Sequence, residues 1–197
     1  MSPRALLLIA VGYLLGSISF AVLIVRLKTG KDIRTEGSGN AGATNVLRAH
    51  GKALGLLVAL LDVAKGAAAV LLVRLVTADP RAAGAAAFAA ILGHVFPLYY
   101  GFRGGKGVAT AVGAFLALVP VPTLICMGVF IAAVAITRYV SVGSMVAMSL
   151  LPAAMGLFHE PMAVVVAAAA AAVLIVFKHL ENLKRLAAGS ERKLGRK

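Results

Sequence analysis

Long apolar runs are the feature of this sequence that most limits how it can fold. Four of them are about as long as the roughly 20 residues that a helix needs to cross the hydrocarbon of a bilayer. They lie at about 4–26, 53–76, 82–100 and 160–178. The mean hydropathy of +0.96 is too high for a soluble domain, because a single core could not bury so much apolar surface. The sequence therefore predicts an all-α, polytopic integral membrane protein.

The segment 107–158 is also apolar, but it is too long for two spans and is interrupted. Proline lacks the backbone N–H that continues a helix, so Pro120-Val121-Pro122 predicts a turn, and Arg138 breaks the apolar run again. Three short helices fit the pattern, at 107–121, 122–137 and 141–158. The total is then about seven helices, with five full spans as the alternative, because short helices need not all cross.

Positive charges gather in the loops of one predicted side. The loop 26–52 holds six Lys or Arg, the loop 101–107 holds two, and the tail from Lys178 holds seven. The opposite side has only Arg4, Arg74 and Arg81. The positive-inside rule then predicts an external N-terminus and a cytoplasmic C-terminus. Arg138 and Ser144 share the cytoplasmic side with seven spans, and are external with five.

The polar parts of the chain are strongly basic as a whole. It has 20 Lys and Arg against 7 Asp and Glu, an excess that suits anionic lipid headgroups, anionic substrates or both. A nucleic-acid partner is not expected, because aromatic residues make up only 6%, Trp is absent, and no polar stretch is long enough for a separate module.

The first polar segment reads GSGNAGATNVLR, from Gly37 to Arg48. Glycines let backbone N–H groups approach an anion, and short Ser, Thr and Asn side chains add donors around it. The Arg48 guanidinium could bind two phosphate oxygens at once. The alternative is a flexible connection between two helices.

The second polar segment reads GHVFPLYYGFRGGKGVAT, from Gly93 to Thr110. Its Gly104–Gly107 core precedes a predicted helix, whose N-terminal amides together with Lys106 form a natural anion cradle. It is not a Walker nucleotide-binding loop, which requires Gly where Tyr100 stands and Ser or Thr where Gly107 stands.

The third polar segment reads KHLENLKRLAAGSERKLG, from Lys178 to Gly195, and continues the last apolar run. His179 and Asn182 are three residues apart and share the face of a predicted amphipathic helix at the membrane surface. A surface anchor for anionic lipid is the alternative. Within the membrane, Asp62 and Lys65 are spaced to pair on one helix face, and we expect a structural role for them.

The carboxylates of the polar segments are too few for metal chemistry. Asp32, Glu36, Glu181 and Glu191 form no paired acidic motif, so a divalent metal is not expected. No His is followed five residues later by Asp, the acid-base pair that many soluble-type glycerolipid acyltransferases use. What remains is a set of anion and hydroxyl donors, which suits reactants that carry phosphate themselves.

In this order and on one predicted side, GSGNAGATNVLR, GHVFPLYYGFRGGKGVAT and HLENLKRL with GSERK resemble the bacterial acyl-phosphate:glycerol-3-phosphate acyltransferase family, often called PlsY. The resemblance covers nearly the whole chain. It implies one seven-helix domain over 1–197 in the bacterial cytoplasmic membrane, with the motif segments 37–48, 93–110 and 178–195 on the cytoplasmic face. The implied reaction moves a fatty acyl group from acyl phosphate to the 1-hydroxyl of sn-glycerol 3-phosphate, giving lysophosphatidic acid and phosphate. This is the first committed step of bacterial phospholipid synthesis.

Carried onto this sequence, the resemblance implies five catalytic residues: Ser38, Arg48, Lys106, His179 and Asn182. It implies eight substrate-binding residues: Gly39, Asn40, Thr44, Asn45, Gly104, Gly105, Gly107 and Ser144. Glu191 is expected to be structural, like Asp62 and Lys65. Ala41 and Leu180 depart from the family pattern, which often has Pro and Arg there. No cofactor is implied, and we expect a monomer in membrane lipid with a functional link to the enzyme that makes acyl phosphate.

Our mechanistic hypothesis is that Arg48, Lys106 and the glycine-loop amides hold both substrate phosphates. A substrate phosphate oxygen then accepts the hydroxyl proton, while His179 and Asn182 orient the acceptor. A phosphate transporter is the main rival, but transporters usually bind near the midplane between internal repeats, and no repeat is seen here. A non-enzymatic lipid-binding protein would leave the Gly, Asn and Ser loops unexplained.

Overall fold

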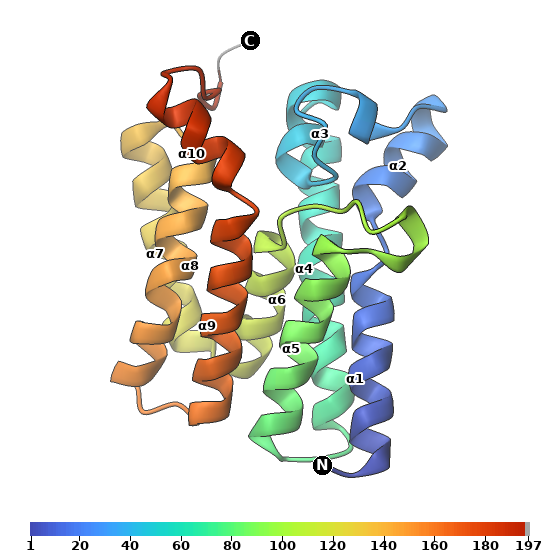
Figure 1. Cartoon of the computed structure of the whole chain (residues 1–197), viewed down its shortest axis with the longest axis vertical. Helices are drawn as coiled ribbons and strands as arrows, with labels where there is room; N and C mark the ends of the chain where they lie inside the picture. Colours follow the sequence, from blue (N-terminus) through green and yellow to red (C-terminus); the bar gives the residue numbers. More distant parts are fainter. Residues whose placement is uncertain (196–197) are drawn as a thin grey trace.

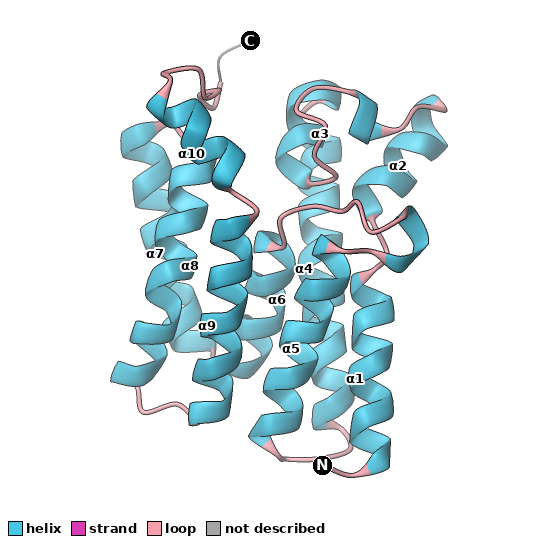
Figure 2. Cartoon of the chain, viewed as in Figure 1, coloured by secondary structure: helices cyan, strands magenta, loops and turns pink. Residues whose placement is uncertain are grey.

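The computed structural model describes residues 1–195, which form helices and connecting loops (Figure 2). The first half contains α1 (Pro3–Gly16), α2 (Phe20–Thr29), the 3-10 turn η1 (Ile33–Thr35), α3 (Ala43–His50), α4 (Lys52–Arg74), α5 (Pro80–Val95) and the 3-10 turn η2 (Leu98–Tyr100). The second half contains α6 (Val108–Leu118), α7 (Pro120–Thr137), α8 (Val140–Leu157), α9 (Met162–Phe177) and α10 (Leu180–Ala187). Arg196 and Lys197, two of the basic residues counted in the tail, lie outside the described residues. The all-α prediction is confirmed.

Within residues 1–195, five helical segments are long and apolar enough to cross a membrane. They are Pro3–Thr29, Lys52–Arg74, Pro80–Tyr100, Pro120–Thr137 and Val140–Leu157. A sixth is α9 taken together with α10, which are bent by 49° at their junction. The 11 residues of α6 extend only about 16 Å, roughly half of the hydrocarbon thickness. All seven apolar segments are thus helical, and the number of full crossings stays a prediction.

Three predicted boundaries differ from the structure. The break between α6 and α7 falls at Val119, and Pro120 and Pro122 lie in the first turn of α7, where a missing N–H costs nothing because those donors have no intrahelical acceptor. The predicted span 4–26 is divided at Ser17–Ser19 into α1 and α2. The first motif is a loop only up to Gly42, after which α3 begins, so Arg48 lies on a helix.

The helices pack as two groups that meet through α6 and through a direct contact between α5 and α9. In Figure 1, α1, α4 and α5 stand together, α7, α8 and α9 form the second group, and the short α6 lies between them. Glycines permit the closest crossings: a side chain at Gly66 of α4 would overlap the Thr110 carbonyl of α6, and one at Gly93 of α5 would overlap the Tyr13 carbonyl of α1. Small residues bring membrane helices together in this way without a water-driven hydrophobic force.

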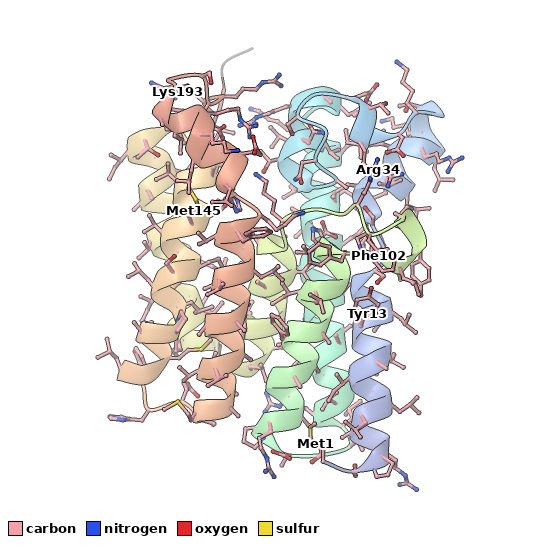
Figure 3. The ribbon with its side chains drawn as sticks, in the orientation of Figure 1. Met1, Tyr13, Arg34, Phe102, Met145 and Lys193 are labelled. Atoms are coloured by element: carbon pink, nitrogen blue, oxygen red, sulfur yellow. The ribbon has the colours of Figure 1, made fainter. Side chains whose placement is uncertain are left out.

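The polar segments lie at one end of this bundle. The loops that precede α3 and α6 lie with α10 and the tail at the end opposite the N-terminus (Figure 1). In Figure 3, Lys193 of the tail and Met1 mark these two ends. Arg138 lies at the tail's end, since its guanidinium donates to the Leu194 carbonyl at 3.0 Å. This is the end that the seven-segment interpretation assigns to Arg138.

Candidate functional site

The second and third motifs meet through a direct side-chain contact. Lys106, in the loop before α6, donates to the Oδ1 atom of Asn182 on α10. The Nδ2 atom of the same Asn182 donates to the Glu191 carboxylate in the tail, at 2.7 Å. Three residues from distant parts of the sequence therefore form one chain of hydrogen bonds, and three residues predicted to act at or near one site lie together.

Glu191 is the hub of this network. Besides Asn182, the Oγ of Ser141 donates to it at 2.8 Å and the Nε of Arg185 donates at 2.8 Å. Its side chain is buried, and although burial raises its pKa, the hydrogen bonds from Arg185, Asn182 and Ser141 outweigh burial and hold the pKa below its usual value. Glu191 is therefore an ionised acceptor that fixes its neighbours, and the structural role expected for it stays a prediction.

Ser141 was missed by the sequence reasoning, which named Ser144 one turn further along α8. Both are buried, but Ser144 donates to the Val140 carbonyl of its own helix at 2.8 Å, whereas Ser141 reaches Glu191. The signal available in the sequence was that both serines lie in the first two turns of α8, three residues apart, and so share one face. Only the position of the tail distinguishes them.

Arg48 joins the first motif to the tail. It is half-buried in the last turn of α3, and its guanidinium donates to the Arg192 carbonyl at 2.9 Å. Arg48 also lies close enough to Lys106 to disfavour that residue's charge. All three motifs therefore converge at this end of the bundle, as the sequence predicts.

Lys106 lies among other cations. Burial is the largest cause that lowers its pKa to about 8, and the positive charges of Arg185, Arg48 and Lys178 lower it further, opposed by Glu191. The described residues near it thus place several positive charges against a single carboxylate. Such a cluster is stabilised by a bound anion, which would also raise the Lys106 pKa again.

His179 is held neutral with one ring nitrogen free to accept. Its Nδ1 lies 2.7 Å from the Ile175 carbonyl, and since a carbonyl can only accept, Nδ1 carries the proton and Nε2 is an acceptor. Burial is the main cause that lowers the pKa of His179 to about 4, and the charge of Lys106 adds to it. The ring is therefore uncharged at neutral pH.

Asn45 shapes the first motif from within. Its Oδ1 accepts from the Ser38 N–H at 2.9 Å, and its Nδ2 donates to the carbonyls of Ile33, Glu36 and Asn40 at 3.0–3.1 Å. The side chain is 1% exposed. The neighbouring Ser38 is exposed, and among the described residues its hydroxyl has no hydrogen-bond partner. Asn45 thus holds the loop, and the Ser38 hydroxyl remains available.

The glycines of the second motif act differently from a simple amide cradle. The N–H groups of Gly104 and Gly105 donate to the carbonyls of Val95 and His94, at 3.3 and 3.1 Å. A side chain at Gly105 would overlap the His94 ring, so this glycine lets the loop pass directly over that ring. Gly107 has a left-handed φ of +88° and directly precedes α6. The first backbone N–H groups of this helix have no intrahelical acceptor. Open donors therefore come from the start of α6.

The predicted Asp62–Lys65 pair is present, and it lies beneath this loop. Lys65 Nζ is 2.8 Å from Asp62 Oδ1 and donates to the Ile18 carbonyl at 2.7 Å, in the break between α1 and α2. The Nδ1 atom of His94 is 3.6 Å from the same carboxylate oxygen. Both charges are buried, so the pair links α4 to the α1–α2 break and, through His94, to the Gly105 loop.

The geometry of a metal site is not seen at this end. Among residues 1–195, no group of three or more His, Cys, Asp or Glu side chains is placed to hold a metal ion. The carboxylate of Glu191 is occupied by three protein donors. The side chains that converge are hydrogen-bond donors and one neutral imidazole, which can bind and orient phosphate and hydroxyl groups.

Known proteins resemble this chain over nearly its full length. A family model described as glycerol-3-phosphate acyltransferase matches residues 6–189. Glycerol-3-phosphate acyltransferases of Clostridioides difficile and Shouchella clausii are 47% and 46% identical to it, over 98% and 94% of this chain and 96% and 94% of theirs. A crystal structure described as PlsY (YgiH), an integral membrane glycerol 3-phosphate acyltransferase in the glycerol 3-phosphate form, superposes with a TM-score of 0.93 at 41% identity, covering 97% of this chain and 96% of that one. The structure described as its lysophosphatidic acid form superposes with a TM-score of 0.89 at 39% sequence identity. The match covers 97% of this chain and 95% of that one.

Proposed function

Because the chain belongs to the glycerol-3-phosphate acyltransferase family, we propose that it transfers a fatty acyl group from acyl phosphate to the 1-hydroxyl of sn-glycerol 3-phosphate. It is an integral membrane acyltransferase of phospholipid synthesis by family and fold. The glycerol 3-phosphate and lysophosphatidic acid forms of the PlsY structure support the proposed acceptor and product. The step would be the first committed one in making bacterial phospholipid.

The observation that carries the choice of donor is the charge of the site. Arg48, Lys106 and Arg185 lie near one carboxylate, that of Glu191, whose oxygens already accept from Ser141, Asn182 and Arg185. Acyl phosphate and glycerol 3-phosphate each bring a phosphate with up to about two negative charges. Two such anions match the excess of positive charge, and a donor that carries its own activated phosphate needs no further activation by the protein.

The reaction balances without a protein base. The 1-hydroxyl oxygen attacks the carbonyl carbon of the acyl phosphate, the bond from that carbon to the phosphate oxygen breaks, and the hydroxyl proton leaves with the phosphate. His179 is a poor proton acceptor because its pKa is lowered to about 4, chiefly by burial. A phosphate oxygen, whose second pKa is about 6, is the better base. The Nε2 of His179 would accept a hydrogen bond from the hydroxyl and so aim its oxygen.

We assign roles to the other predicted site residues from where they lie in the structure. Ser38, Gly39, Asn40 and Thr44 line the open side of the first motif, where hydroxyl and amide donors can reach the glycerol phosphate. Asn45 positions these residues and does not contact the substrate, because its side-chain amide donates to carbonyls of the same loop. Gly104, Gly105 and Gly107 bring the backbone over His94 to the start of α6, and Lys106 and Asn182 contact the reactants. Ser144 would contribute from α8 beside Ser141.

The acyl chain has a place beside the polar site. A groove of about 530 Å³ runs between α8 and α9, lined by small or apolar residues that include Pro152, Ala172 and Phe177, and it reaches Leu180. Leu180 follows His179 directly, so a chain in this groove would end near the reacting centre. The chain could enter sideways from the lipid, which suits a donor that is itself membrane-bound.

We make four further proposals about the protein in its membrane. The motif end faces the cytoplasm of a bacterial inner membrane, because basic residues concentrate there. The protein works as a monomer and receives its donor from the enzyme that makes acyl phosphate. No metal or cofactor takes part.

The proposed function is tested by donor competition. The purified protein in lipid is given labelled glycerol 3-phosphate with palmitoyl phosphate, palmitoyl-CoA or palmitoyl-acyl carrier protein, and labelled lysophosphatidic acid is measured. Product from palmitoyl phosphate only, with one phosphate released per product, supports the proposal. Product from palmitoyl-CoA but not from palmitoyl phosphate contradicts it while leaving the family assignment in place.

A further inference from the structure

A second basic groove lies apart from the candidate site. It has a volume of about 780 Å³ and runs between the end of α2, η1 and η2. It is lined by Arg26, Asp32, Arg34, Thr35, Tyr99, Tyr100, Gly101 and Arg103. The last four belong to the second motif segment, but none of the eight is one of the candidate site residues named above. In Figure 3 the labelled Arg34 and Phe102 lie together on the side of the molecule away from Lys193 and the tail.

The guanidinium of Arg34 lines this groove and is paired with a carboxylate. Its Nε and Nη2 donate to the two oxygens of Asp32, at 3.0 and 2.6 Å, and its Nη1 donates to the Tyr100 carbonyl at 2.8 Å. The guanidinium also stacks 5.9 Å from the centre of the Tyr100 ring. Both oxygens of the Asp32 carboxylate therefore accept from Arg34, and the bond from Arg34 to the Tyr100 carbonyl links η1 to η2.

Arg26 and Arg103 keep their charges unpaired. Both are exposed, and among residues 1–195 neither guanidinium forms a salt bridge with a carboxylate or a hydrogen bond through its side chain. They approach the groove from two elements, α2 and the segment after η2. A groove that presents two free guanidiniums around a rigid tyrosine and arginine wall favours an anionic group that can accept from both.

Exposed apolar side chains lie next to the groove's lining residues in the chain: Leu27 follows Arg26, Leu98 precedes Tyr99, and Phe102 precedes Arg103. Leu27 of α2 is 79% exposed, and Leu98 and Phe102 around η2 are 47% and 55% exposed. Since η2 closes the helical segment Pro80–Tyr100, the groove lies where a membrane span ends. Tyrosines are typical of this level, where the headgroups lie. A water-soluble anion has no apolar part to contact these side chains. An anionic lipid has both an anionic headgroup and apolar chains.

We infer that this groove binds the headgroup of an anionic phospholipid of the surrounding bilayer, with Arg26 and Arg103 on its phosphate and the acyl chains along Leu27, Leu98 and Phe102. The site is separate from the one that binds the reactants. It anchors η1, whose following loop leads into the first motif, and η2, which lies within the second motif ahead of Gly104–Gly107.

The test compares two double variants that remove the same charge at the same end of the molecule. Arg26→Gln/Arg103→Gln changes the groove, and Lys28→Gln/Lys52→Gln is the matched control, since both lysines are exposed and lie outside it. Acyl transfer in detergent first shows that both are folded. Native mass spectrometry then titrates phosphatidylglycerol binding against phosphatidylcholine, with wild type and both variants at the same ionic strength, because salt screens exposed charges.

The groove variant should bind phosphatidylglycerol about 30-fold more weakly, because each interfacial guanidinium is worth about 1 kcal/mol. The control should bind like wild type. Equal losses in both double variants, or equal binding of phosphatidylcholine by wild type, would overturn the inference. Displacement of the lipid by inorganic phosphate alone would also overturn it, because the groove would then be a soluble-anion site.

Discussion

The pH dependence of acyl transfer should carry an alkaline limb that belongs to Lys106. Burial, together with Arg185, Arg48 and Lys178, lowers the pKa of this lysine to about 8. As the pH rises through that value the ammonium group loses its proton, and with it a charge-assisted hydrogen bond to phosphate. Such a bond is worth about 1.5–3 kcal/mol, so kcat/KM for glycerol 3-phosphate should fall about 10- to 160-fold, at first by about tenfold per pH unit.

The Lys106→Arg variant tests whether the limb belongs to this residue. A guanidinium stays charged up to pH values of about 12, so the variant should lose the alkaline limb even though its rate is lower at every pH. In wild type the limb in kcat should lie at higher pH than the limb in kcat/KM, because bound phosphate raises the Lys106 pKa in the complex. Initial rates with labelled glycerol 3-phosphate, corrected for spontaneous hydrolysis of the donor, give both profiles. An unchanged alkaline limb in Lys106→Arg, or none in wild type, would refute the reasoning.

Three other predictions concern the bundle, the second loop and metals. Lys65→Met should lower the free energy of unfolding by about 3–5 kcal/mol because it leaves the buried Asp62 carboxylate unpaired, and Asp62→Asn added to it should restore most of the loss in thermal unfolding assays. Gly105→Ala should lower kcat/KM at least about tenfold because its methyl group would overlap the His94 ring and displace the loop that holds the substrate phosphate, whereas Gly128→Ala, which meets open space, should behave like wild type. Chelators should leave initial rates unchanged; a loss restored by added Mg²⁺ would contradict the metal-free mechanism.

Much of the fold follows directly from local pattern. Apolar runs of membrane length and the prolines at 120 and 122 are local signals, so the helices and most of their order could be predicted. The break at Ser17–Ser19 could not, since it depends on Lys65, which takes the Ile18 carbonyl from another helix. How far α6 extends into the membrane could not be predicted either, because a short apolar helix and a spanning helix have the same composition.

The candidate site was predicted as a set of residues but not as a network. The glycine-rich loop indicated Lys106 as a phosphate ligand, and the family resemblance implied Asn182 and a structural Glu191. Their hydrogen bonds depend on how far α10 turns from α9, a bend of 49° that no local pattern predicts. For the same reason Ser141 was missed, since its partner Glu191 lies 50 residues away along the chain.

The central claim is that one cation cluster at the motif end holds the phosphates while an acyl group moves from acyl phosphate to glycerol 3-phosphate. Its most direct test is metal-free acyl transfer from palmitoyl phosphate in lipid by wild type, Lys106→Ala and the surface control Lys28→Ala. We expect labelled lysophosphatidic acid from wild type and Lys28→Ala, and almost none from Lys106→Ala. Full activity in Lys106→Ala, or no product from wild type, would contradict it.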